Sequence, residues 1–191
     1  MLDYELKFST NGLHVYNRNH KILANSDTFN DYYNHDFWYS VGLPAIQGVI
    51  ALPTDDHEVS LLTAKIDIGV IDDVYTGFAT SISHSQINTD TLDELGAMHV
   101  KDDMIIEDTL SQGGILTSVR HSNGRDWWTI IPKHNSNEYY GVLSTPKMHK
   151  VVHIQTIGKK IGNGLIGSSF SPDGKWYARN TVTDIEDDRL D

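Results

Sequence analysis

Residues 115–160 constrain the fold of this chain most strongly, because four strand-like runs follow one another closely there. Those runs cover residues 115–121, 125–132, 138–145 and 151–157. β-Branched and aromatic side chains are frequent in them, and Asn123-Gly124 and Pro146 supply turn signals between them. Because short connections join antiparallel neighbours, the sequence predicts a meander of four strands.

A four-stranded meander has the size and strand order of one blade of a β-propeller. Gly124 lies in an Asn-Gly turn, and Gly174 ends a Ser-Pro-Asp-Gly sequence that suits a type I turn with a left-handed glycine. The two glycines stand 50 positions apart, close to the spacing of the longer propeller repeats. We therefore predict an all-β protein, a partial β-propeller built from four-stranded antiparallel meander blades. Further strands are predicted at residues 6–10, 13–16, 47–53, 59–66, 74–82, 104–108, 164–170 and 175–180.

These runs divide the chain into an open arc of blades. Residues 1–45 form the end of one blade and a long packed loop, 46–110 form a blade, 115–160 form the next, and 163–191 begin another. A closed ring typically needs at least about four blades. We therefore expect the remaining blades of a longer chain to be partners of this arc.

Composition excludes several classes of function. The chain has 26 acidic and 15 basic residues, and its formal net charge of −11 repels nucleic acid and anionic membranes. It has no cysteine, which rules out disulfides, cysteine zinc sites and thiol catalysis. The sequence contains no run of about 18 apolar residues, so no membrane insertion is expected. The N-terminus lacks a signal-peptide pattern, so the protein is expected to be cytoplasmic or to begin upstream.

The hairpin around Asn123-Gly124 is one candidate binding element. A two-residue turn would place His121 opposite Asp126, where their side chains can form a hydrogen bond, and Arg120 opposite Trp127, whose ring it can cover. The functional interpretation is a ligand-binding turn at a propeller mouth. The structural interpretation, which we favour, is a hairpin whose register these cross-strand pairs fix.

Adjacent aromatic residues on the strands give a second candidate. Neighbours on a strand point to opposite faces, so one of each pair would pack between blades and the other would lie nearer solvent. Exposed aromatic rings could stack on sugars, although packing between blades is the commoner use. The candidate binding residues are therefore His121, Asn123, Arg125, Asp126, Trp127, Trp128, Tyr139, Tyr140 and Trp176.

No motif predicts a metal, a cofactor or a catalytic residue. His149 and His153 would share one face of a strand, but about 13 Å apart, which is too far for one metal ion. The glycine pattern at 162–167 precedes a strand, with no helix to hold a phosphate, and is interpreted as an inter-blade loop. The acidic C-terminal residues after 183 are interpreted as a solvated segment.

Five stretches also resemble a known family when taken in order. They are Gly-Leu-Pro at 42–44, Gln-Gly to Leu-Pro at 47–53, Arg-His-Ser-Asn-Gly-Arg-Asp-Trp-Trp at 120–128, Asn-Ser-Asn-Glu-Tyr-Tyr at 135–140 and Phe-Ser-Pro-Asp-Gly at 170–174. The chain resembles the large exported, WD40-like β-propeller proteins of gliding and related Gram-negative bacteria, many of which carry a type IX secretion sorting domain. The resemblance implies a non-catalytic protein that is extracellular or on the cell surface. This chain shows neither a signal peptide nor that sorting domain.

We accordingly expect a binding or scaffold module for a glycan or a surface protein. The alternative is a hydrolase or lyase with its active site at the propeller channel or in another domain. A third hypothesis is a structural spacer, for which replacing Trp127 or Trp176 by alanine would cost about 3–5 kcal/mol of stability and no separable binding.

Overall fold

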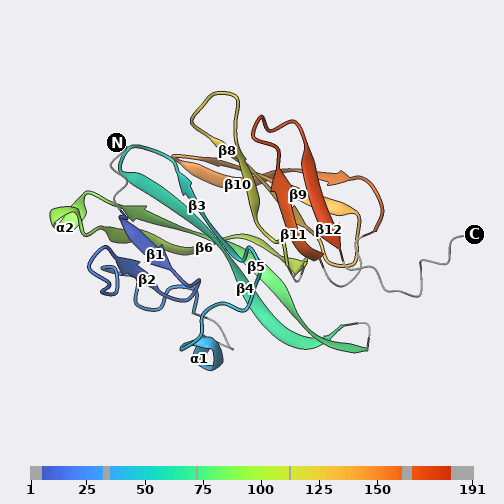
Figure 1. Cartoon of the computed structure of the whole chain (residues 1–191), viewed down its shortest axis with the longest axis horizontal. Coiled ribbons are helices and arrows are strands. Elements are labelled where there is room, and N and C mark those ends of the chain that lie inside the picture. The colour runs from blue at the N-terminus through green and yellow to red at the C-terminus, as the bar shows by residue number, and fades with distance from the viewer. Residues whose placement is uncertain (1–5, 32–34, 72, 112, 161–164, 182–191) are drawn as a thin grey trace, which may run out of the picture.

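The computed structural model describes residues 6–31, 35–71, 73–111, 113–160 and 165–181 and shows an all-β protein (Figure 1). Sheet A contains β1 (Phe8–Thr10) and β2 (Val15–Asn17), and sheet B contains β3 (Val49–Pro53), β4 (Glu58–Ile71), β5 (Val74–Asn88) and β6 (Ala97–Leu110). Sheet C contains β7 (Thr117–Arg120), β8 (Trp127–Pro132), β9 (Glu138–Thr145) and β10 (Met148–Thr156), and sheet D contains β11 (Leu165–Phe170) and β12 (Tyr177–Thr181). Two single-turn helices, α1 (His35–Trp38) and α2 (Thr91–Glu94), lie in connections.

Sheets B and C confirm the predicted four-stranded antiparallel meanders. In each sheet the strands pair in chain order, β3-β4-β5-β6 and β7-β8-β9-β10. The predicted edge strand at 104–108 is part of β6, which begins at Ala97 and lies at the outer edge of sheet B. The strands of sheet B are longer than predicted, because β4 and β5 stay paired from Glu58↔Asn88 to Ile71↔Val74.

The four sheets pack in chain order as an open stack, and the described residues form no closed ring. A core cluster between sheets B and C contains Leu62, Ile82, Ile131 and Val142 among its buried side chains. A second cluster joins sheet A to sheet B, and a third joins sheet C to sheet D through Tyr139 and Tyr177. Each four-stranded sheet therefore has a neighbouring sheet on both faces, although the two-stranded sheet D covers only part of sheet C.

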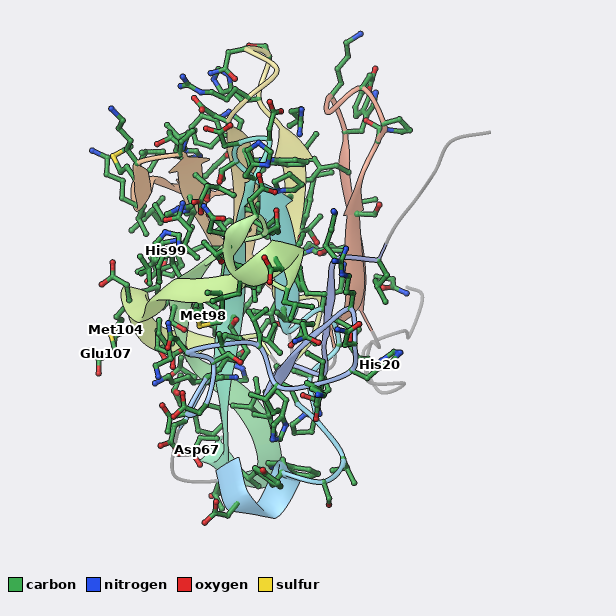
Figure 2. The ribbon with its side chains drawn as sticks, turned by 90° about the vertical axis from the view of Figure 1, so that its left-hand side faces the viewer. His20, Asp67, Met98, His99, Met104 and Glu107 are labelled. Atoms are coloured by element: carbon green, nitrogen blue, oxygen red, sulfur yellow. The ribbon has the colours of Figure 1, made fainter. Side chains whose placement is uncertain are left out.

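Side chains on β6 show how this outer strand divides core from solvent. Met98 is 1 % exposed and packs in the cluster between sheets A and B, whereas Met104 is 53 % exposed. Figure 2 shows Met104 and Glu107 projecting outward from β6, at the margin of the molecule. β6 thus alternates between buried side chains, such as Met98 and Ile106, and side chains exposed at the edge of sheet B.

The first hairpin differs from its predicted two-residue turn. Thr10 pairs with Val15, so four residues form the loop instead of Asn11-Gly12 alone. The side-chain oxygen of Asn11 accepts hydrogen bonds from the backbone of Leu13 and His14, at 3.0 and 2.8 Å. An asparagine that bonds its own following backbone favours this wider loop over a type I′ turn.

The connection from 25 to 45 is mostly the predicted long loop, although α1 makes one helical turn within it. Three features of the sequence lie outside the described residues in whole or in part. They are the tyrosines at 32 and 33, the first part of the glycine pattern at 162–167 and the acidic C-terminal segment.

Candidate binding site

The innermost strands of sheets B, C and D meet at Gln47, which lies two residues before β3. Its side-chain amide donates to the Ser168 carbonyl at 2.9 Å and accepts from the Ser168 backbone N–H at 2.8 Å. Thr117 on β7 contacts both residues through its hydroxyl. We call these three residues the Gln47 cluster. Because it joins segments 121 positions apart, the cluster fixes how the three sheets converge.

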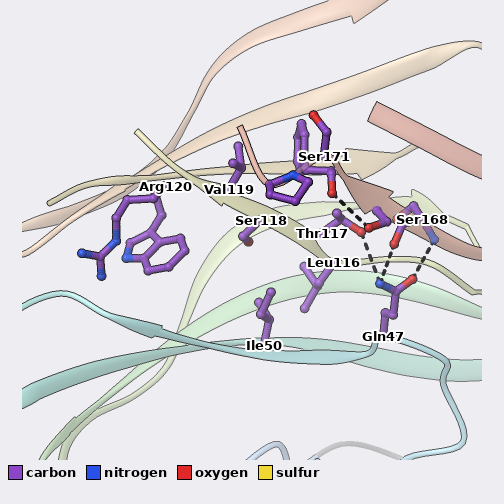
Figure 3. Close-up of a pocket in the computed structure, with 13 residues that line it drawn as sticks. Gln47, Ile50, Leu116, Thr117, Ser118, Val119, Arg120, Ser168 and Ser171 are labelled. Carbon is purple, nitrogen blue, oxygen red and sulfur yellow. Dashed lines mark hydrogen bonds between the residues drawn. The ribbon is translucent and has the colours of Figure 1, made fainter. Parts of the chain in front are cut away.

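An open pocket of about 380 Å³ lies beside the Gln47 cluster (Figure 3). Ser118, Ser169 and Ser171 add hydroxyl groups to its wall, while Ile50 and Phe170 add apolar surface. Arg120 and Trp127 close one end of it. This inner-strand pocket combines apolar surface with many hydrogen-bonding groups, the usual make-up of a small-ligand site.

The predicted stacking of Arg120 on Trp127 is confirmed. The guanidinium carbon lies 4.7 Å from the ring centroid, and an Arg120 N–H donates to the Gly124 carbonyl at 2.9 Å. The indole N–H of Trp127 donates to the Pro53 carbonyl at 2.8 Å, which ties β8 to the end of β3. The cation therefore rests on a ring that the neighbouring sheet holds in place.

A second pocket, of about 670 Å³, lies on the other side of Arg120. The two carboxylates Asp55 and Asp56 line it together with the guanidinium groups of Arg120 and Arg125. Both aspartates are exposed, and they belong to the turn between β3 and β4. We call this space the carboxylate pocket. Arg120 lines both spaces, so the two pockets are neighbours and are treated together as one candidate site.

The hairpin between β7 and β8 keeps the predicted register but has a different turn. Arg120 pairs with Trp127, as predicted. However, the Gly124 N–H bonds the His121 carbonyl at 2.9 Å, and only Gly124 has a positive φ, of 74°. These features give a type I turn followed by a left-handed glycine, not a two-residue type I′ turn.

The expected side-chain bond between His121 and Asp126 is replaced by bonds within the turn. The buried Asp126 carboxylate accepts from Arg125 at 2.7 and 3.2 Å and from the Asn123 amide at 2.7 Å. Arg125 therefore lowers the pKa of Asp126, with a smaller contribution from Asn123. The His121 ring instead accepts from the Asn123 backbone N–H at 3.1 Å. Asn123 and Asp126 thus shape the turn and are not free to bind a ligand.

The remaining candidate aromatics lie apart from the two pockets. Trp128 is on the opposite face of sheet C from Trp127, beside the rings of His121 and His153. Tyr139 is 6 % exposed and packs between sheets C and D. Tyr140 faces sheet B, where its hydroxyl donates to Asp108 at 2.5 Å. The predicted alternation of faces is confirmed for both pairs.

Trp176 is the exposed member of its aromatic pair, with 75 % of its surface exposed at the turn between β11 and β12, while Tyr177 packs on Tyr139. The Gly174 N–H bonds the Ser171 carbonyl at 2.8 Å in this turn, and Gly174 has a φ of 71°. The predicted type I turn with a left-handed glycine is therefore confirmed here. Trp176 lies beyond its closing residues and contributes nothing to the core.

The two histidines of β10 do not share a face. A bulge between Val151 and His153 shifts the register, which reverses the alternation of side chains. His149 turns toward sheet B and stacks on His84 with ring centroids 3.7 Å apart, whereas His153 lies beside Trp128. Within the ranges that the structure describes, no three histidine or acidic side chains are grouped to hold a metal ion.

Sequence reasoning missed the Gln47 cluster and the two carboxylates of the site. Gln47, Thr117 and Ser168 are ordinary polar residues at strand ends, and only the packing of three sheets brings them together. Asp55 and Asp56 were assigned to a turn without a role. Gln47 also has a positive φ of 57°, which no sequence pattern reveals, so the sequence held no signal for this cluster.

Comparisons with known proteins assign no relative to this chain. No protein family, no curated protein and no solved structure matches it. Among the described helices, none is long and apolar enough to cross a membrane.

Proposed function

We propose that this protein is a segment of a β-propeller and acts as a non-catalytic binding module for a glycan. The observation that carries the proposal is the Arg120–Trp127 stack, which stands between the inner-strand pocket and the carboxylate pocket. Propellers commonly bind ligands where their innermost strands and connecting turns meet the central channel, and this site lies on such strands.

Strand order and packing support the propeller architecture. The first strand of each sheet, β3, β7 or β11, lies next to the first strand of the following sheet, through the Gln47 cluster. β10 likewise contacts β6, its counterpart at the outer edge. In a β-propeller, the inner strands of successive blades lie next to each other, and so do the outer strands. The matching turns at Gly124 and Gly174 add a repeat in the chain.

The chemistry of the site suits a carbohydrate. Sugars present vicinal hydroxyls, which bind carboxylates and guanidinium groups in pairs, and apolar C–H faces, which pack on rings. Asp55, Asp56 and Arg125 offer such charged groups in the carboxylate pocket, while Trp127 and Phe170 offer ring surface in the inner-strand pocket. Neutral or cationic glycans are favoured over strongly anionic ones, because the chain is acidic overall.

A small ligand is favoured over a protein partner by the shape of the site. Two concave spaces of about 380 and 670 Å³ match the size of small-molecule sites, whereas protein interfaces are broad and flat. A location at the cell surface or outside the cell follows from the family resemblance and is part of the proposal. It would place the module where glycans are abundant.

A glycan array probed with the purified chain tests this proposal. We expect the chain to bind one class of glycan. The affinity should fall at least tenfold in Arg120→Ala and in the double variant Asp55→Asn/Asp56→Asn. Arg18→Ala is the matched control, because Arg18 also donates one hydrogen bond to a backbone carbonyl, that of Asp93. A folded chain that binds no glycan, or one whose binding survives both variants, would overturn the proposal.

A further inference from the structure

The two ends of the sheet stack are half-sheets with free edges. Sheets A and D have two strands each, whereas sheets B and C have four. Among the described strands, β12 pairs only with β11, and β1 pairs only with β2. An exposed strand edge presents unpaired N–H and C=O groups and is a template for another strand.

Sheet D corresponds to the inner half of a blade. It reaches the inner strand β7, where Gly174 lies against Val119 and Ser168 joins the Gln47 cluster. Farther out, sheet C is uncovered on this side. Gln155 and Ile157, in and just after the outer strand β10, line a cavity of about 480 Å³ on this side, and Ile157 is 57 % exposed.

Sheet A corresponds to the outer half of a blade. Its Val15 packs in a cluster with Leu61, Ile87 and Met98, which come from β4, β5 and β6, and the inner strand β3 contributes nothing to that cluster. The segment after β2 also bridges to the outer strand, where Ala24 pairs with Ala97. Sheet D thus lacks the outer half of a blade, which sheet A supplies, and sheet A lacks the inner half, which sheet D supplies.

One chain cannot join its own two halves, because sheets A and D lie at opposite ends of the stack, on the far sides of sheets B and C (Figure 1). We propose that sheet D is completed by sheet A of a second copy of this chain, with β1 of the second copy pairing with the free edge of β12. This inference rests on the proposed propeller architecture and goes beyond the proposed glycan site.

The faces of the two half-sheets agree with such a joint blade. Tyr177 and Arg179 face sheet C, since both contact Tyr139, so Ala178 between them points to the other face. In sheet A, Phe8 and Val15 face sheet B of their own chain. In the joint blade, the Ala178 face would therefore continue the Phe8 face, and both would cover sheet B of the second copy.

The number of strands allows the assembly to close. The twelve described strands equal three blades of four, so two copies related by a twofold axis would supply six blades. Closed propellers typically have about four to eight. Each copy would contribute sheet A at one junction and sheet D at the other, so both two-stranded sheets of the described ranges would be completed.

Light scattering on the purified chain across a wide concentration range tests the dimer. We expect a mass twice the 21.5 kDa of one chain. Ala178 is exposed in one chain, and the joint blade would bury it, so the variant Ala178→Lys should be a monomer. The control variant Trp176→Lys, in the adjacent turn, should remain a dimer. A wild-type chain that stays monomeric would overturn the proposal, whether or not another segment of the same polypeptide completes sheet D. A dimer that Ala178→Lys leaves unaffected would also overturn it.

Engineered cysteines test the pairing itself, because the chain has none of its own. The double variant Thr10→Cys/Ala178→Cys should form a disulfide-linked dimer under mild oxidation, while Asn19→Cys/Ala178→Cys, with its first cysteine beyond β2, should not. Equal cross-linking of both variants, or a ladder of long oligomers, would overturn the closed dimer. An Ala178→Lys monomer that still binds the glycan would separate this question from the proposed function.

Discussion

Acid should destabilise this protein through the His84–His149 pair. His84 lies on β5 and His149 on β10, so the stacked rings join sheet B to sheet C. Burial lowers the pKa of His84 to about 4, against the opposing effect of Asp103, and lowers the pKa of His149 to about 3, with a further lowering by His84. Both rings are therefore neutral in the folded protein at pH 7.

The sign of the effect follows from these lowered pKa values. Between the ordinary pKa of 6.5 and the folded values, the unfolded chain binds protons that the folded chain does not, so the free energy of unfolding falls as the pH falls. Lowering the pKa of one histidine from 6.5 to about 4 corresponds to a loss of about 3 kcal/mol in the free energy of unfolding at low pH. His149 is only partly buried and is screened by solvent, so we expect the pair to lose about 4 kcal/mol in all.

Urea unfolding at a series of pH values between 7 and 3 measures this loss. His149→Phe keeps an aromatic ring on His84 but removes one titrating group, so its stability should depend less on pH over that range. His153→Phe, an exposed position on the same strand, is the control and should follow the wild type. The reasoning is refuted if the wild type loses less than about 1 kcal/mol between pH 6.5 and 4.5, or if both variants follow the same curve.

Asp108 and Asp173 titrate in a lower and separable range, whereas burial raises the pKa of Asp102. The pKa of Asp108 is lowered because hydrogen bonds from Tyr140 and Lys133 outweigh the effect of burial. That of Asp173 is lowered by the hydroxyl of Ser171. Their stabilising contributions are complete above the ordinary value of 3.8 and are lost below it. The histidine loss should therefore begin first as acid is added.

Other predictions concern single side chains, each measured by thermal and urea unfolding. Gln47→Leu should cost about 2 kcal/mol, because it leaves backbone groups of β11 without their partners. Trp127→Ala should cost about 3 kcal/mol, through the lost ring and its bond to β3, whereas Trp176→Ala should change stability by less than about 0.5 kcal/mol. Gly174→Ala should cost more than Gly124→Ala, although both have a positive φ, because only the former would place a Cβ 3.0 Å from a neighbouring side chain.

The spacer hypothesis is separated from a binding module by the same tryptophans. It predicted that alanine at Trp176 would destabilise the fold, and the exposed position of Trp176 contradicts this. Trp127 does carry packing and a hydrogen bond, so its replacement combines structural and binding effects. Arg120, which is exposed and has one backbone partner, is the better probe of ligand binding.

The strands could be predicted from the sequence, because their signals are local. Runs of β-branched and aromatic residues, separated by turn residues, predicted both meanders, and alternation along a strand predicted that Trp127 and Trp128 face opposite ways. The turn at Gly174 was also predicted, since a proline and a glycine at fixed offsets define its backbone.

Which of these residues meet depends on the tertiary structure. The Gln47 cluster depends on three sheets converging, and the bulge near His153 reversed a face that strict alternation had assigned. Asp126 forms its hydrogen bonds within the turn, to the Arg125 and Asn123 side chains, and not with His121 on the opposite strand. Local patterns specify backbone shape, but contacts between distant segments depend on how whole sheets pack, and that information is spread over the entire chain.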